Sequence, residues 1–153
     1  MRSDLLDAQA AVDWAVAQIP LLQQSLIDWQ RRQPYDIVRQ PDPKSEGDIV
    51  VAAQQTPLPL MFNAWIGATL NSLRSSLDLL AAALATRNGK KPSSKTHFPI
   101  FASEQAMLDP LHGLESKKWL SNSERAAIKA LRPYKGGDAS LWPLHQLDIL
   151  RKH

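Results

Sequence analysis

The sequence predicts a mainly α-helical protein, a helical bundle around one long central helix, with a single small antiparallel β-hairpin. Residues 60–87 contain no proline and are rich in alanine and leucine, and apolar residues recur at helical spacing through residues 3–32. Two β-favouring runs, residues 35–39 and 48–52, are separated by the turn-forming residues 41–47, which predicts the hairpin.

Pro20 lies inside the first helical segment, and because proline removes a backbone donor we expect a kink or a short break near Ile19. Ser121 and Glu124 have the spacing of a capping box, which marks the start of a later helix. The shorter helices that follow the central one are expected at residues 103–108, at 110–119, at 121–131 and from about Ser140 to the end.

Length and composition fit one helical domain over residues 1–153, with the hairpin at about 35–53, because 153 residues that are 44% apolar can build one ordinary core. The chain has no cysteine, which excludes disulfides and thiolate metal sites. Residues 1–7 lack a basic region followed by an apolar one, so a cytoplasmic location is expected. No stop signal follows the last helical segment, which is typical of a chain truncated at its C-terminus.

Charge is unevenly distributed along the chain. Residues 1–86 hold six basic and nine acidic residues, whereas residues 87–153 hold twelve and six, which gives the overall charge of +3. The basic second half permits contact with nucleic acid or another polyanion, although a solvated basic surface is the simpler interpretation. The uncharged residues 49–73 are interrupted by Pro57 and Pro59, so no contact with a membrane is expected.

A narrow polar stripe runs along the predicted central helix. Its members recur at a spacing of three to four residues and are Gly67, Asn71, Arg74, Ser75 and Asp78. Charged side chains are costly to bury without partners, so Arg74 and Asp78 must pair with each other, face polar groups or line a wet cleft. The last helix offers such groups on one face, namely His145, Asp148 and Lys152, so we expect Arg74 to meet Asp148 and Asp78 to meet His145 or Lys152.

Two interpretations of these residues stay open. In the structural one, they form a buried ion-pair network that sets the register between two helices. In the functional one, they form a pocket in which an arginine holds an anionic group and a histidine moves a proton. The candidate catalytic residues are then Arg74, Asp78 and His145, and the candidate ligand-binding residues are Asn71, Ser75, Asp148 and Lys152.

Metal and cofactor sites are not expected. The four histidines lie far apart in the sequence, without the spacing of metal ligands, at positions 97, 112, 145 and 153. The chain also lacks a glycine-rich loop that could cradle phosphate and a nucleophile elbow.

Four segments, Asn71–Ala81, His97–Ile100, Leu131–Tyr134 and Leu141–Asp148, resemble an uncharacterised group of bacterial and phage proteins. In that group a helix of the pattern N-L-R-S-A-L-D-H-L is followed by F-P-I, by Q-P-Y and by a final L-D-x-x-D-K-H. The resemblance covers residues 71–153 with the motifs in the same order.

The helix of that group is similar to the Arg-x(4)-His signature of HEPN-type helical ribonucleases. The resemblance implies that the arginine and histidine act on an RNA phosphodiester, usually at a homodimer interface. Arg74 matches the arginine, but Leu79 stands at the histidine position, so His145 or His153 would have to replace the missing acid or base.

Two functions are therefore predicted. The first is a helical interaction or ligand-binding module of bacterial or phage origin, without a catalytic motif, that self-associates or binds a protein partner. The second is a HEPN-like RNA-binding protein or ribonuclease of a phage-defence or toxin–antitoxin system.

Overall fold

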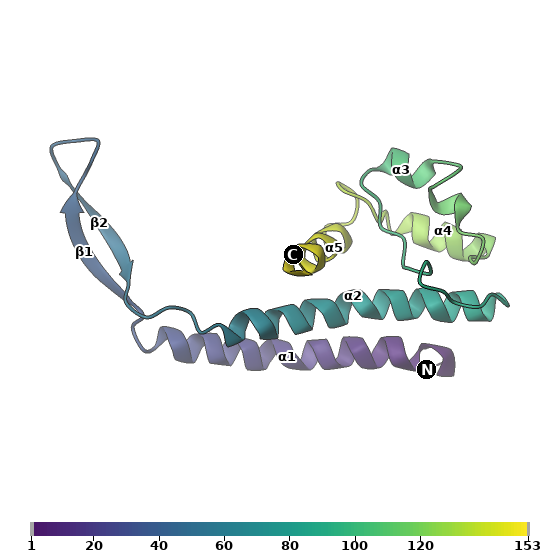
Figure 1. The fold of residues 1–153 in the computed structure, drawn as a ribbon, viewed down its shortest axis with the longest axis horizontal. Coiled ribbons are helices and arrows are strands. Elements are labelled where there is room, and N and C mark those ends of the chain that lie inside the picture. The colour runs from purple at the N-terminus through teal and green to yellow at the C-terminus, as the bar shows by residue number, and fades with distance from the viewer. Residues whose placement is uncertain (1, 153) are drawn as a thin grey trace. The chain divides into compact units, whose positions relative to one another are not determined.

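The computed structural model describes the backbone of residues 2–152 and the side chains of residues 2–150, and it confirms a mainly helical chain with one antiparallel hairpin (Figure 1). That the helices form a bundle around a central one stays a prediction. The main elements are α1 (Leu6–Gln30), β1 (Tyr35–Pro41), β2 (Asp48–Gln54), α2 (Met61–Arg87), α3 (Glu104–Leu108), α4 (Asn122–Ala130) and α5 (Leu141–Lys152), and short 3₁₀ helices cover Ser3–Leu5 and Leu114–Ser116.

The chain forms two compact units. One combines the residues up to Val16 with those from Gly67 onward, and the other consists of Ala17–Ile66. Both α1 and α2 contribute to each unit. The expectation that the whole chain is a single domain stays a prediction.

The hairpin belongs to the unit of residues 17–66. Tyr35 lies opposite Gln54 in its register, and the Asp42 carboxylate stabilises the turn by accepting hydrogen bonds from the Lys44 amide and the Ser45 hydroxyl. A two-stranded hairpin is marginal in water by itself. The buried Trp29 at the end of α1 contacts the Tyr35 ring edge to face, with 5.8 Å between the ring centroids, and so attaches the hairpin to the helix.

Helix α1 continues through Pro20, so the expected break near Ile19 is absent from this part of the chain. Proline removes one N–H donor, which here would bond to the carbonyl of Val16, and the other turns of a 25-residue helix keep their own hydrogen bonds. Close to this point, the Trp65 indole of α2 donates to the Gln18 side chain at 3.1 Å. This contact joins the two helices within the same unit.

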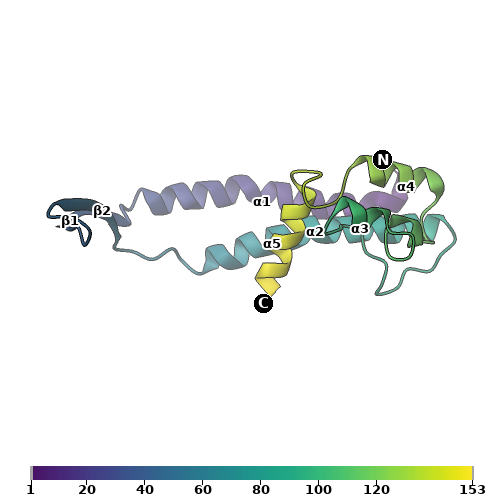
Figure 2. The same ribbon diagram turned by 90° about the horizontal axis from the view of Figure 1, so that it is seen from above.

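In the other unit, the start of α1 runs beside α2 in the opposite direction (Figures 1 and 2). Arg87 pairs with Asp4 at 2.6 Å, and the Ser72 hydroxyl donates to the carbonyl of Ala11 at 2.9 Å. The core of this unit lies on another side of α2, where α2 meets the loops and short helices that follow it. It consists of Ala81, Leu84, Phe98, Met107, Leu114, Leu120, Ile128 and Tyr134.

The prediction of a helix at residues 110–119 is wrong. This segment forms turns and the short 3₁₀ helix Leu114–Ser116. The Asp109 carboxylate accepts hydrogen bonds from the amides of Leu111 and His112, and such side-chain turns compete with helix formation. A side chain at position 113 would meet the Met107 carbonyl at 2.3 Å, so the close turn also requires Gly113.

Helix α4 begins with the predicted capping box. The Glu124 amide donates to the Ser121 hydroxyl at 3.3 Å, and the Ser121 amide donates to the Glu124 carboxylate at 2.8 Å. The same carboxylate accepts a hydrogen bond of 2.6 Å from Asn88, which follows α2. Glu124 therefore both starts α4 and connects it to the end of α2.

No helix within residues 2–152 combines the length and the apolar character that crossing a membrane requires.

The Glu124 carboxylate predicts a loss of stability in acid. Burial disfavours its charged form, but the hydrogen bonds from Ser121 and Asn88 outweigh this effect and hold its pKa below the ordinary value of 4.5. A carboxyl whose pKa is lower in the folded state stabilises the fold above the unfolded pKa, and this contribution is lost as the pH falls through the folded pKa. We expect the free energy of unfolding, measured by urea denaturation, to fall below pH 4.5, and to fall less steeply in Glu124→Gln.

Glu115→Gln is the matched control, because the Glu115 side chain is 69% exposed and its pairing with Arg125 is loose, at 3.8 Å. Equal acid sensitivity of Glu124→Gln and the wild type would contradict the assignment.

Candidate functional site

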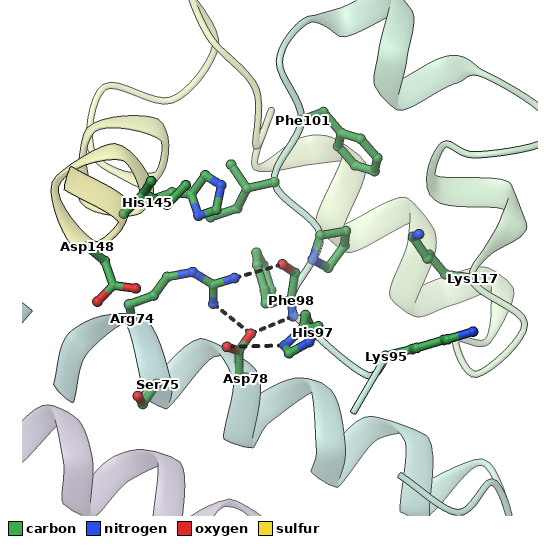
Figure 3. A pocket seen from close by; sticks show the side chains of 13 residues that line it. Arg74, Ser75, Asp78, Lys95, His97, Phe98, Phe101, Lys117, His145 and Asp148 are labelled. Atoms are coloured by element: carbon green, nitrogen blue, oxygen red, sulfur yellow. Dashed lines mark hydrogen bonds and ion pairs between the residues drawn. The ribbon is translucent and has the colours of Figure 1, made fainter. Parts of the chain in front are cut away.

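A cavity of about 460 Å³ lies between α2, residues 95–101 and α5 (Figure 3). All of its lining residues belong to the unit that contains residues 67 onward. Its apolar wall is formed by residues 98–101 and Ile149. Its polar lining consists of Arg74, Ser75, Asp78, Lys95, His97, Lys117, His145 and Asp148.

Arg74 and Asp78 hold the backbone of Phe98 between them. Arg74 Nη1 donates to Asp78 Oδ1 at 2.6 Å, as expected for an i, i+4 pair on α2. The same Oδ1 accepts the Phe98 amide at 2.9 Å, and Arg74 Nη2 donates to the Phe98 carbonyl at 3.4 Å (Figure 3). The pair therefore satisfies both backbone polar groups of a residue that is only 3% exposed.

His97 faces the other oxygen of the same carboxylate. Its Nδ1 lies 3.5 Å from Asp78 Oδ2, a distance that allows an ion pair when the imidazole is protonated. The imidazole is 60% exposed and lines the cavity, so it is accessible from solvent. Sequence reasoning did not select His97 as a site residue, although its place directly before the buried Phe98 was a usable signal.

The structure brings five of the seven predicted site residues to this cavity, namely Arg74, Ser75, Asp78, His145 and Asp148. Asp148 is 3% exposed and lies beside Arg74, and the half-buried His145 stands one turn earlier on α5 (Figure 3). Asp138 fixes the start of α5 by accepting hydrogen bonds from the amides of Ser140 and Leu141.

The contacts of Arg74 and Asp78 that the structure describes are with each other, with the backbone of Phe98 and, for Asp78, with His97. The expected meeting of Arg74 with Asp148 and of Asp78 with His145 stays a prediction. Asn71 does not line the cavity, since residues 97–101 lie beside the later turns of α2. The side chain of Lys152 lies outside the described residues, so its expected pairing with Asp78 stays a prediction.

Two lysines complete the lining, and neither was predicted as a site residue. Lys95 is exposed in the loop before His97, and the half-buried Lys117 follows the 3₁₀ helix Leu114–Ser116. Because the charges of Arg74 and Asp78 offset each other, the two lysines outnumber the remaining carboxylate, that of Asp148. The cavity therefore carries an excess of positive charge before either histidine is protonated.

Within the part of the chain that the structure describes, no three histidine, aspartate or glutamate side chains gather in a group that could hold a metal ion.

The contacts of Asp78 predict that its loss destabilises the fold. In Asp78→Ala the Phe98 amide is buried without an acceptor and Arg74 loses its charged partner, so we expect a decrease of roughly 2 kcal/mol in the free energy of unfolding. Hydrogen exchange of the Phe98 amide should accelerate.

Ser75→Ala is the control, because Ser75 lines the cavity from the same helix, whereas the side chains that hydrogen-bond the Phe98 backbone in the described structure are those of Arg74 and Asp78. Unchanged exchange of the Phe98 amide in Asp78→Ala would show that the carboxylate does not hold this loop.

Comparison with known proteins gives no relative from which to assign a function: no family model, no curated protein and no solved structure matches the chain.

Proposed function

We propose that this chain is a ligand-binding module that takes a small anion into the cavity between α2 and α5. One observation carries the proposal: Lys95 and His97 from one loop, Lys117 from a second loop and His145 from α5 line a single cavity. Its volume of about 460 Å³ falls in the range of roughly 300–1,000 Å³ that is usual for small-molecule sites.

In this proposal Arg74 does not hold the anionic ligand, which was the role that the sequence suggested for it. Arg74 is 8% exposed, and its guanidinium is engaged by Asp78 and by the Phe98 carbonyl. The guanidinium of Arg74 therefore stabilises the loop that carries Lys95 and His97. The anion would bind to Lys95 and Lys117, which line the same cavity from two other segments of the chain.

Inorganic phosphate is a suitable first probe. We expect it to shift the backbone amide resonances of Lys95, His97 and Lys117 in a nitrogen-15 NMR titration. Lys117→Glu should weaken this binding by about tenfold, because a charge-assisted contact contributes about 1.5 kcal/mol or more.

Lys118→Glu is the matched control, since it makes the same change of charge at the neighbouring, exposed residue that does not line the cavity. Equal weakening by the two variants would mean that only the overall charge of the chain attracts phosphate, and the proposal would then fail.

The second candidate is an RNA-binding protein or ribonuclease, as the resemblance to HEPN-type proteins implies. Leu79 stands where that signature has histidine, but two other imidazoles, of His97 and His145, line the same cavity. In such a reaction one imidazole removes the proton of a ribose 2′-hydroxyl as its oxygen attacks phosphorus. The other donates a proton to the departing 5′-oxygen.

Incubation with single-stranded RNA tests this candidate. If it holds, the wild type cleaves RNA to cyclic phosphate products, and both His97→Ala and His145→Ala lose at least about a hundredfold in rate. His112→Ala is the control, because His112 is exposed and does not line the cavity. Phosphate binding without RNA cleavage would leave the binding module as the function.

Self-association or binding of a protein partner is part of the same proposal, and so are a bacterial or phage origin and a cytoplasmic location. Support for an interaction surface comes from α5, where Leu147 is 47% exposed and Leu150 is 71% exposed.

A further inference from the structure

We infer that the ligand of this cavity is an organic anion with an apolar body, such as an aryl phosphate or an aryl carboxylate. Its anionic group would lie at Lys95 and Lys117, and its body against Ile100, Phe101 and Ile149. This inference rests on the proposed function, because it specifies the ligand of the same site.

The apolar wall is the first argument. Phe98 and Pro99 are buried, whereas Ile100 and Phe101 are only half-buried and Ile149 is 37% exposed. These last three side chains line the cavity together with the charged groups. An inorganic ion bound at the lysines would leave the apolar surface of these three side chains in water. An apolar ligand body would cover that surface.

The wall is also fixed before any ligand binds. The Phe101 amide donates to the Pro133 carbonyl at 2.8 Å, and the Lys135 amide donates to the Phe101 carbonyl at 3.2 Å. On the preceding side, Arg74 and Asp78 hold Phe98. The segment from Phe98 to Phe101 is therefore anchored at both ends, so little conformational entropy is lost when a ligand packs against it.

The distribution of charge in the cavity predicts the orientation of the bound ligand. Lys95 and Lys117 lie on one side of the cavity, and His145 and Asp148 lie on the opposite side, with Phe98 between them (Figure 3). A ligand with its anionic group toward the lysines therefore extends along the apolar wall toward α5. The volume of about 460 Å³ falls in the range of small-molecule sites, which leaves room for a ring beside the charged group.

Two phosphate monoesters that carry the same charged group but differ in their apolar part test this inference. Phenyl phosphate and methyl phosphate are titrated into the full chain and followed by calorimetry and by nitrogen-15 NMR. Because burial of a phenyl-sized group stabilises a complex by about 1.5 kcal/mol or more, we expect phenyl phosphate to bind at least about tenfold more tightly.

Variants on α5 locate the apolar contact. Ile149→Thr should weaken binding of phenyl phosphate by roughly threefold or more and leave methyl phosphate unchanged. Leu150→Thr is the matched control on the same helix, because Leu150 is 71% exposed and does not line the cavity. Lys117→Glu should weaken the binding of both esters.

The outcomes separate this inference from the proposed function. Equal affinity for the two esters, both sensitive to Lys117→Glu, would overturn the apolar body and leave the anion site standing. Binding of the uncharged benzyl alcohol as tightly as phenyl phosphate, without any effect of Lys117→Glu, would overturn the anion site. If neither ester shifts the resonances of the cavity residues, both proposals fail.

Discussion

The structure of the site depends on one interaction, the clamp that Arg74 and Asp78 form on the backbone of Phe98. A buried peptide group needs partners for its N–H and its C=O, and here one ion pair on one face of α2 provides both. Two charges that would be costly in an apolar interior are in turn neutralised by each other and by a peptide dipole. The ion pair therefore lowers the cost of burying the Phe98 peptide, and the peptide lowers the cost of burying the ion pair.

The clamp positions the rest of the cavity. It holds Phe98 in the core cluster and so brings Lys95 and His97 to the cavity from one side and Ile100 and Phe101 from the other. Hydrogen bonds at the starts of α4 and α5 also position segments around the cavity. Glu124 connects α4 to the end of α2, and Asp138 fixes the start of α5, from which His145 and Asp148 reach the cavity.

The two interpretations of the polar stripe apply to different residues of one site. Arg74 and Asp78 fit the structural interpretation, because their contacts hold a loop. Lys95, Lys117 and His97 fit the functional interpretation, because they line the cavity beside this pair and the two lysines outnumber its remaining carboxylate. The chemistry of a ligand would therefore depend on residues that sequence periodicity does not distinguish from an ordinary solvated surface.

Sequence by itself determined the helix Met61–Arg87, the hairpin and the capping box of α4, and it offered the pairing of Arg74 with Asp78 as one of three alternatives. Each of these arises from local hydrogen bonding and from periodicity. Only the tertiary structure decided that a loop peptide closes over that pair and that Lys117 joins it in lining one cavity. These features depend on the side chains and carbonyls that approach in space, and no pattern along the chain records them.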